Sequence, residues 1–355
     1  MAGTTPCDSI VGRNDRILVT GATGFIGSRL VANLFDRGFR KIRCFARPSS
    51  VAARIQSLSA FAGIGNVEVM TGNLLSREDC ITATRDVAVI FHLAAGRGEK
   101  SFPDAFMNTV VTTRNLLEAC MQHQCLKRFV NVSSFAVYTN NKKPQGRMLD
   151  ESCPVETHPA IRGDAYCFAK VRQDEIVAEY SKQFGIPCVT VRPGVVYGPG
   201  NEAIHARVGI GTFGLFLHLG GSNAIPLTYV DNCADAIALV GLKTDTQGEV
   251  FNIVDDNLPS SRQFLRLYKR NVKRFKSVYV PHFLSYALCY GWERYSAWSM
   301  GQLPPLFNRH RWYANWSKTH YSNAKLKGIG WKPKVSTSEG LTIYFNACLN
   351  GVRNA

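Results

Sequence analysis

The chain of 355 residues is 45% hydrophobic and carries a formal net charge of +16. This length and composition predict a globular protein, either one large α/β domain or one with a smaller partner, and exclude a small disulfide-stabilised module. The eleven cysteines form no C-x-x-C pair and no Cys/His cluster at metal spacing, so we expect reduced thiols, no disulfide and no metal site. The N-terminal residues lack the features of a signal peptide, and we expect a cytoplasmic protein.

The first predicted element is a buried strand that turns sharply into a helix. Residues 17–27 read ILVTGATGFIG, an apolar run followed by glycines at every third position, Gly21, Gly24 and Gly27. The first glycine permits a tight turn, the second lets the backbone approach a pyrophosphate, and the third lets the helix pack closely on the strand. Free N–H groups at the start of the helix bind the phosphates. The stretch therefore predicts a dinucleotide site rather than an ordinary strand-to-helix turn.

The glycine spacing G-x-x-G-x-x-G differs from the G-x-G-x-x-G of ordinary dehydrogenases. With the sequence TGATGFIG, it resembles the extended branch of the short-chain dehydrogenase/reductase superfamily, the NAD-dependent epimerase/dehydratase family. The resemblance implies that Thr23, Phe25 and Ile26 contact the cofactor together with the glycines.

The next two predicted strands supply the adenosine side of the site. In this architecture an acid about 20 residues after the glycines binds the ribose of NAD, whereas an arginine accommodates the 2′-phosphate of NADP. The second strand ends near Phe45 and is followed by Arg47 with no acid nearby. NADP is therefore favoured over NAD, unless Arg47 is only a solvated loop residue. The third strand, residues 66–70, leads to Asn73 and Leu74. The family usually has Gly-Asp-Leu here, with the acid contacting the adenine. The resemblance therefore implies an adenine contact at Asn73, which keeps an acceptor oxygen but lacks the charge of the acid.

A fourth apolar strand, residues 87–93, ends in Leu93, Ala94 and Ala95. The resemblance implies that the backbone of these small residues lies against the cofactor. The neighbouring His92 is expected to be a packed or loop histidine rather than a catalyst.

A helix at residues 108–120 and a fifth strand at residues 129–132 follow, and Ser134 comes directly after that strand. Strands that alternate with helices predict a parallel sheet, which binds ligands at the carboxyl ends of its strands. The fold class is therefore α/β, a doubly wound parallel sheet (Rossmann fold), and Ser134 lies at its ligand-binding edge.

The spacing Tyr-x-x-x-Lys occurs three times, beginning at Tyr138, Tyr166 and Tyr321. In a helix it places a phenol and an ammonium on one face, where the cation favours the phenolate. Only Tyr166 opens a convincing helical stretch, residues 165–185, with Lys170 one turn later. We therefore choose this pair as the chemical one.

With Ser134, the pair Tyr166 and Lys170 matches the Ser-Tyr-Lys triad of the family. The resemblance implies that Tyr166 exchanges the proton of a substrate hydroxyl or carbonyl, while Ser134 hydrogen-bonds the same oxygen. Lys170 would hold the nicotinamide ribose and lower the pKa of Tyr166 from its usual value of about 10.

Residues 192–200, RPGVVYGPG, match the family turn beside the nicotinamide, which implies that Pro193 and Val196 contact the cofactor. The resemblance runs from residue 17 to residue 254 and returns weakly at residues 328–333. We predict a smaller, partly C-terminal substrate-binding lobe. The expected division is a tail at 1–15, a dinucleotide-binding domain at 16–194 and 229–254, and the lobe at 195–228 and 255–345.

Two substrate classes compete. Nucleotide-sugar epimerases and dehydratases usually carry an asparagine where this chain has Gly194, and an arginine shortly before Tyr-Val-Asp, which this chain lacks. Resemblance of the segment from Tyr229 to the 3β-hydroxysteroid dehydrogenase branch favours oxidoreduction of a secondary alcohol and a ketone on a hydrophobic or ring-bearing substrate. The alternatives are a nucleotide-sugar epimerase, dehydratase or 4-ketoreductase, and a nucleotide-bound sensor without turnover.

The positive charge is concentrated in residues 262–334, which hold fifteen Lys and Arg, one acid and all five tryptophans. An apolar stretch at residues 278–290 is too short to cross a bilayer, which takes about 20 residues. It predicts either a lid over the active site or a peripheral contact with an anionic membrane. No motif supports nucleic-acid binding, and analogy with relatives suggests a homodimer.

Overall fold

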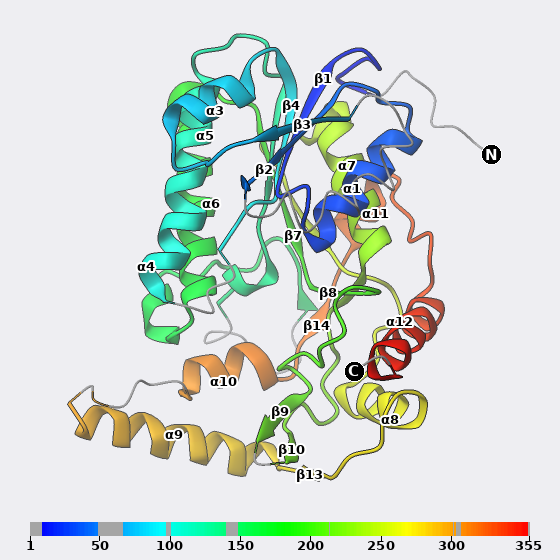
Figure 1. Cartoon of the computed structure of the whole chain (residues 1–355). Helices are drawn as coiled ribbons and strands as arrows, with labels where there is room; N and C mark the ends of the chain where they lie inside the picture. Colours follow the sequence, from blue (N-terminus) through cyan, green and yellow to red (C-terminus); the bar gives the residue numbers. More distant parts are fainter. Residues whose placement is uncertain are drawn as a thin grey trace.

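The computed structural model describes residues 9–48, 67–96, 101–139, 148–212, 214–300, 302 and 307–353. Its centre is a sheet of seven parallel strands with helices on both faces (Figure 1). The strand order β12-β7-β5-β4-β1-β2-β3 reverses its direction between β1 and β4, which confirms the predicted doubly wound fold. The strands are β1 (Arg16–Thr20), β2 (Ile42–Ala46), β3 (Val67–Thr71), β4 (Val87–His92), β5 (Arg128–Val132), β7 (Cys188–Pro193) and β12 (Val250–Ile253).

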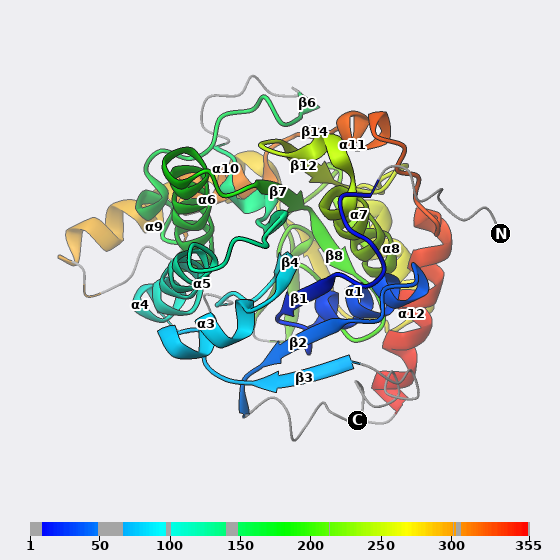
Figure 2. The same ribbon diagram turned by 90° about the horizontal axis from the view of Figure 1, so that it is seen from above.

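The sheet is buried on both faces because its strands are apolar at successive positions. On β1, Ile17 and Val19 enter one hydrophobic cluster, whereas Leu18 enters the cluster on the opposite face. Helices α1 (Phe25–Asp36) and α7 (Val230–Leu242) cover the first face, and α3 (Arg77–Thr84), α5 (Thr112–Cys120) and α6 (Ala165–Phe184) cover the second (Figure 2).

The predicted helix at residues 108–120 begins earlier in the structure. It starts as α4 (Phe102–Ala105), where the Ser101 hydroxyl accepts from the Asp104 N–H at 3.2 Å and Pro103 occupies the first turn. A π-helical segment, η2 (Phe106–Val111), then joins α4 to α5. Such widened turns often occur at functional sites, and this one borders the cavity described below.

Smaller elements gather beyond one end of the sheet (Figure 1). Strand β8 (Val195–Tyr197) pairs with β11 (Leu227–Tyr229), and β9 (Gly209–Thr212), β10 (Leu215–His218) and β13 (Ser277–Tyr279) form a second small sheet. A third sheet pairs β6 (Met148–Leu149) with β14 (His320–Tyr321). The helices of this part are α8 (Ser261–Asn271), α9 (His282–Trp298), α10 (Arg309–Trp316) and α12 (Thr337–Arg353), whereas α11 (Ala324–Gly328) lies beside the central sheet.

Two segments outside the predicted dinucleotide domain pack against its core. Leu326 and Trp331, inside the range predicted for the lobe, belong to the same hydrophobic cluster as Ile17. In the predicted N-terminal tail, the Ile10 N–H donates to the Leu242 carbonyl at 2.9 Å and Val11 is buried. The weak return of family resemblance near Trp331 therefore corresponds to a physical return of the chain to the sheet.

The ten cysteines in the described ranges are free thiols, and all except Cys125 are buried. Among the described residues, no group of three or more His, Cys, Asp and Glu side chains is arranged to hold a metal ion. The helices seen in these ranges are all too short or too polar to cross a membrane.

Candidate active site

The glycine-rich turn joins β1 to α1 and leaves its backbone open to a ligand. Gly21 has a φ of 70°, which favours glycine, and a Cβ there would lie 2.9 Å from the Ala94 nitrogen. A Cβ on Gly27 would lie 2.1 Å from the Gly21 carbonyl oxygen. Gly24 is the N-cap of α1 and no side chain caps the helix. The N–H groups and positive dipole of the helix thus remain available to a phosphate, and this cradle fits a dinucleotide.

This turn forms one wall of a cavity of about 780 Å³. Every cofactor-binding and catalytic residue predicted from the sequence lines it. These residues are Gly21, Thr23, Gly24, Phe25, Ile26, Gly27, Arg47, Asn73, Leu74, Leu93, Ala94, Ala95, Ser134, Tyr166, Lys170, Pro193 and Val196.

The cavity also has lining residues that sequence reasoning missed. Asp104, Asn108 and Thr112 project from the helical segment that contains the π-helical turn, and Asn108 donates to the Asp104 carbonyl and carboxylate at 3.0 and 3.1 Å. Their spacing i, i+4, i+8 places the three polar side chains on one side of the helical segment and is the signal that could have found them.

At the adenosine end, Arg47 follows β2, is exposed and lines the cavity. The Asn73 side-chain oxygen accepts from the Leu75 N–H at 3.0 Å, and the Asn73 N–H donates to Asp79 at 2.7 Å. Asn73 thus shapes the turn after β3, and its side-chain oxygen is already engaged in that turn.

Tyr166 and Ser134 meet at the opposite end of the cavity. Ser134 caps the short helix η3 (Phe135–Val137), and Tyr166 lies in the first turn of α6, whose N-cap Asp164 accepts from the Tyr166 N–H at 3.0 Å. Burial raises the pKa of Tyr166, and a hydrogen bond with the Ser134 side chain acts in the opposite direction. The expected lowering of the Tyr166 pKa by Lys170 is therefore not found, because burial outweighs the groups that favour the phenolate.

The ammonium group of Lys170 is buried and uses two of its three N–H donors within the protein. It donates to the Val132 carbonyl at 2.7 Å and to the Gln173 side-chain oxygen at 2.8 Å. Burial lowers the pKa of Lys170 to about 8, and the nearby Asp174 opposes this shift. Lys170 thus lies beside the cavity in a fixed position, one helical turn from Tyr166.

A buried polar chain connects Lys170 to the start of the glycine-rich turn. The Gln173 amide donates to the Thr113 hydroxyl at 3.0 Å, Thr113 lies 2.9 Å from His92 Nε2, and His92 Nδ1 lies 2.8 Å from the Thr20 hydroxyl. Burial, with the positive charge of Lys170, lowers the pKa of His92 to about 3. His92 is thus the packed, neutral histidine expected from the sequence, and it joins the two sides of the site.

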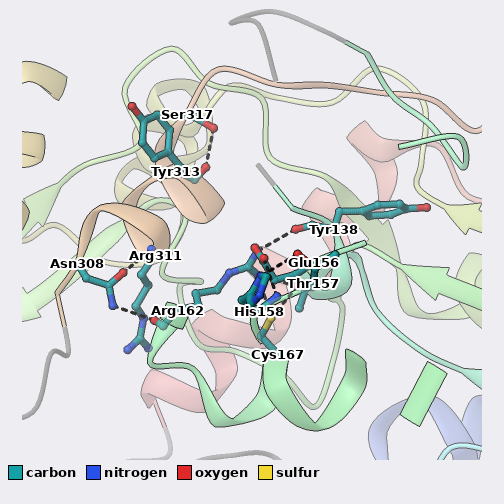
Figure 3. Close-up of polar contacts among 11 residues, drawn as sticks. Tyr138, Glu156, Thr157, His158, Arg162, Cys167, Asn308, Arg311, Tyr313 and Ser317 are labelled. Atoms are coloured by element: carbon teal, nitrogen blue, oxygen red, sulfur yellow. Dashed lines mark hydrogen bonds and ion pairs between the residues drawn. The ribbon is translucent and has the colours of Figure 1, made fainter. Parts of the chain in front are cut away.

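Arg162, which the sequence did not single out, ties the Ser134 loop to the start of α6 (Figure 3). It ends the short helix η4 (Pro159–Arg162) and is 4% exposed. Its guanidinium donates to the Ala136 and Tyr138 carbonyls at 2.6 and 2.8 Å and lies 3.7 Å from the Glu156 carboxylate. On the other side, Asn308 before α10 donates to the Arg162 carbonyl at 3.0 Å, so the C-terminal part is anchored next to the start of α6.

The other two Tyr-x-x-x-Lys spacings are not in the cavity lining. The Tyr138 hydroxyl is buried and donates to Asn252 at 2.7 Å, and Lys142 lies outside the described residues. Tyr321 is in β14, and Lys325 pairs with Glu249. Among the described residues of the three spacings, Tyr166 and Lys170, which context along the chain had selected, are the ones that line the cavity.

At the substrate end, Gly194 has no room for a side chain. A Cβ there would lie 2.3 Å from the Pro226 carbonyl oxygen, because the Val195 N–H donates to that same oxygen at 2.7 Å. An asparagine at this position would push β8 away from β11. Any sugar-binding group must therefore come from another residue.

Comparison with known proteins places these observations in a family. Residues 17–254 match the model of the NAD dependent epimerase/dehydratase family. A trifunctional UDP-glucose 4,6-dehydratase/UDP-4-keto-6-deoxy-D-glucose 3,5-epimerase/UDP-4-keto-L-rhamnose-reductase of Arabidopsis thaliana is 25% identical over 340 residues, which are 92% of this chain and 46% of that protein. The chain thus spans about half the length of this relative.

Two further proteins are similar over most of their length. An uncharacterized UDP-glucose epimerase of Bacillus subtilis is 30% identical over 251 residues, 67% of this chain and 76% of that protein. The crystal structure of UDP-glucuronic acid 4-epimerase from Bacillus cereus, in complex with UDP-glucuronic acid and NAD, has a TM-score of 0.70 at 22% identity and covers 95% of this chain and 99% of that one. The matched region contains the whole central sheet and the Ser134, Tyr166 and Lys170 positions, and the chain therefore belongs to the NAD-dependent epimerase/dehydratase family, the extended short-chain dehydrogenases/reductases.

Proposed function

We propose that the protein is an enzyme that acts on a nucleotide sugar, interconverting a secondary hydroxyl and a ketone as an epimerase, a dehydratase or a 4-ketoreductase. The observation that carries this proposal is the presence of Ser134, Tyr166 and Lys170 in the same cavity as the glycine-rich turn. The names of the relatives support a sugar nucleotide as the substrate class. The steroid-like interpretation that the sequence favoured finds no support among them.

In this mechanism Tyr166 removes or returns the proton of the reacting sugar hydroxyl, and Ser134 donates a hydrogen bond to the same oxygen. Lys170 holds the ribose next to that oxygen from its fixed position on α6. A bound nicotinamide ring supplies the hydride acceptor and, when oxidised, a positive charge that favours the Tyr166 phenolate. The contribution of the protein is mainly the alignment of the sugar carbon with that ring.

Two features of the chain bear on the choice of cofactor. The family description makes NAD the first candidate. The exposed Arg47 at the end of β2, in the cavity wall, suits the 2′-phosphate of NADP. An enzyme that regenerates its cofactor in each turnover retains it tightly, so we expect copurified NAD for an epimerase or dehydratase and exchangeable NADPH for a 4-ketoreductase.

Arg207 is our candidate to bind the diphosphate in place of the missing family residues. Its guanidinium donates to the Tyr321 hydroxyl at 3.2 Å, and the Tyr321 ring stacks on Phe135 with centroids 5.7 Å apart. Phe135 directly follows Ser134, so this contact brings a cation from the predicted lobe to the substrate side of the triad. We therefore assign residues 195–228 and most of 255–345 to substrate binding.

A homodimer is also part of the proposal. Phe102, Phe106 and Met107 leave apolar surface exposed beside α5 and α6, the helices by which analogy with relatives suggests that two copies pair. Sedimentation velocity of the purified chain tests this pairing directly.

The proposed function is tested by purifying the protein without added cofactor and identifying the nucleotide released on denaturation by mass spectrometry. The loaded protein is then incubated with UDP-glucose, UDP-glucuronic acid and dTDP-glucose, and products are separated by chromatography. Tyr166→Phe should retain cofactor and reduce turnover by a factor of about 10²–10⁴. Turnover unaffected by Tyr166→Phe would instead support a nucleotide-bound sensor, and failure to bind either NAD or NADP would refute the proposal.

Arg207→Gln tests the diphosphate assignment. It should raise KM for the nucleotide sugar while the bound cofactor is unchanged, whereas Arg266→Gln, on the exposed side of α8, should change neither. Equal effects of the two substitutions would refute the role of Arg207.

A further inference from the structure

Helix α9 carries its apolar side chains on the outside of the molecule. It lies at the edge of the chain farthest from the central sheet (Figure 1). Phe283, Leu288 and Trp298 are 77%, 62% and 75% exposed, and Leu284 and Tyr295 are exposed with them. Their spacing places them on one side of a helix of 17 residues, which is about 25 Å long. This is an apolar surface on an element that the catalytic cavity does not use.

The opposite side of α9 is the side that packs on the protein, and it is partly polar. Its buried residues are Ser285, Cys289 and Ser296. The Ser285 hydroxyl accepts from the Trp312 indole N–H at 2.9 Å, and Glu293 pairs with Arg309 at 3.0 Å. These contacts with α10 fix the orientation of α9, so its apolar side cannot turn inward without breaking them.

Uncompensated positive charge lies on the segment that precedes the same helix and on the helix itself. Lys273, Arg274 and Lys276 are exposed immediately before β13, which leads into α9, and Arg294 is exposed on α9 itself. None of the four forms an ion pair with a described residue. Val278 and Tyr279 of β13 extend the exposed apolar surface towards this basic group. Apolar side chains thus lie next to cations along one edge of the molecule.

We propose that this edge docks the protein on an anionic lipid bilayer, with α9 lying in the plane of the headgroups. An interfacial helix of this kind inserts its apolar side into the headgroup and acyl boundary, while neighbouring Lys and Arg bind anionic lipid. A second copy of the chain fits the surface less well, because it brings the same unpaired positive charge to the contact. The proposal does not depend on which sugar nucleotide the active site binds.

The structure provides an internal reporter for this contact. Of the five tryptophans, all in the described part, Trp298 alone is exposed; Trp312, Trp316 and Trp331 are buried and Trp292 is half-buried. The full chain is mixed with vesicles of phosphatidylcholine alone or with phosphatidylglycerol, with lipids brominated in the acyl chains. We expect quenching of the exposed tryptophan only on anionic vesicles, and weaker binding at high salt.

Two variants separate the contributions of charge and apolar surface. The triple variant Lys273→Glu, Arg274→Glu, Lys276→Glu should bind anionic vesicles on the order of a hundredfold more weakly. Phe283→Ser with Leu288→Ser should cause a loss of similar order. The matched control is Lys182→Glu with Phe184→Ser on α6, where a basic and an apolar side chain are equally exposed; it should bind as the wild type does.

The same experiment has outcomes that refute the proposal. Binding that is equal on neutral and anionic vesicles, or equal in the α9 and α6 variants, would overturn it. So would wild-type self-association in sedimentation velocity that Phe283→Ser with Leu288→Ser abolishes, without vesicle binding, since the surface would then be covered by a second copy. Unchanged cofactor retention in all variants excludes misfolding as the cause of lost binding.

Discussion

The buried ammonium of Lys170 should make the stability of the protein depend on pH in the alkaline range. Its pKa is lowered from 10.5 to about 8 in the folded state, so above pH 8 the unfolded chain binds more protons at this residue than the folded chain does. Stability therefore rises with pH between about 8 and 10.5, and the charged form below pH 8 is the costly one. From pH 7 to pH 10 the gain from this one group is about 2–3 kcal/mol.

The isosteric variant Lys170→Met isolates this effect from the titration of other groups. Urea unfolding of wild type and variant is measured from pH 7 to pH 10, and the difference between their free energies of unfolding should change by about 2–3 kcal/mol in favour of the wild type. Lys182→Met, exposed on the same helix, is the control and should follow the wild type. Parallel curves for wild type and Lys170→Met would refute the reasoning, because they would mean that burial does not penalise the charged lysine.

Three further predictions concern the framework of the site. Arg162→Ala should destabilise the fold by about 3–5 kcal/mol, since it removes the ion pair of the buried Glu156 carboxylate and the guanidinium hydrogen bonds to the Ala136 and Tyr138 carbonyls. Replacement of the half-exposed Arg172 by alanine should cost less than about 1 kcal/mol in the same urea titration. Gly27→Ala should abolish cofactor retention, read by mass spectrometry, because its Cβ would lie 2.1 Å from the Gly21 oxygen. Burial raises the pKa of Asp235, but hydrogen bonds and the charges of Lys334 and Arg37 outweigh it and hold this pKa below 3.8. The contribution of Asp235 to stability is therefore present at neutral pH and lost as the pH falls through the lowered pKa. Asp235→Asn should destabilise the protein at pH 7, and the loss should become smaller as the pH falls below 3.8.

The cofactor side of the site was predictable because its chemistry depends on local sequence. Gly27 has no room for a side chain because Gly21 lies close to it, and Gly21 has none because Ala94, after the neighbouring strand, lies close to it. Tyr166 and Lys170 lie one turn apart on the same helix. The doubly wound sheet was predictable for the same reason, because each strand and helix shows its own hydrophobic periodicity and the two kinds of element alternate along the chain. Such local features can be recognised in a single amino-acid sequence.

The supporting contacts left no such pattern. Arg162 acts through backbone carbonyls of Ala136 and Tyr138, which any residue type provides, and Gln173 reaches Lys170 through a spacing common to all helices. The apolar residues of α9 were visible in the sequence, but their spacing does not show whether the apolar side of the helix faces a core or solvent. Only the packing of Ser285 and Cys289 against the protein shows which side of α9 is outward.

Burial shifts the pKa values of Tyr166 and Lys170, the two ionisable groups of the proposed mechanism, in opposite directions. It raises the pKa of Tyr166 and lowers that of Lys170 to about 8, so burial opposes the phenolate of Tyr166 and makes the charged form of Lys170 less favourable than in water. Lys170 also directs its N–H groups to Val132 and Gln173 rather than to the phenol. In the proposed mechanism, positive charge that a ligand brings into the cavity favours proton removal by Tyr166, which couples the activation of the base to the occupation of the dinucleotide site.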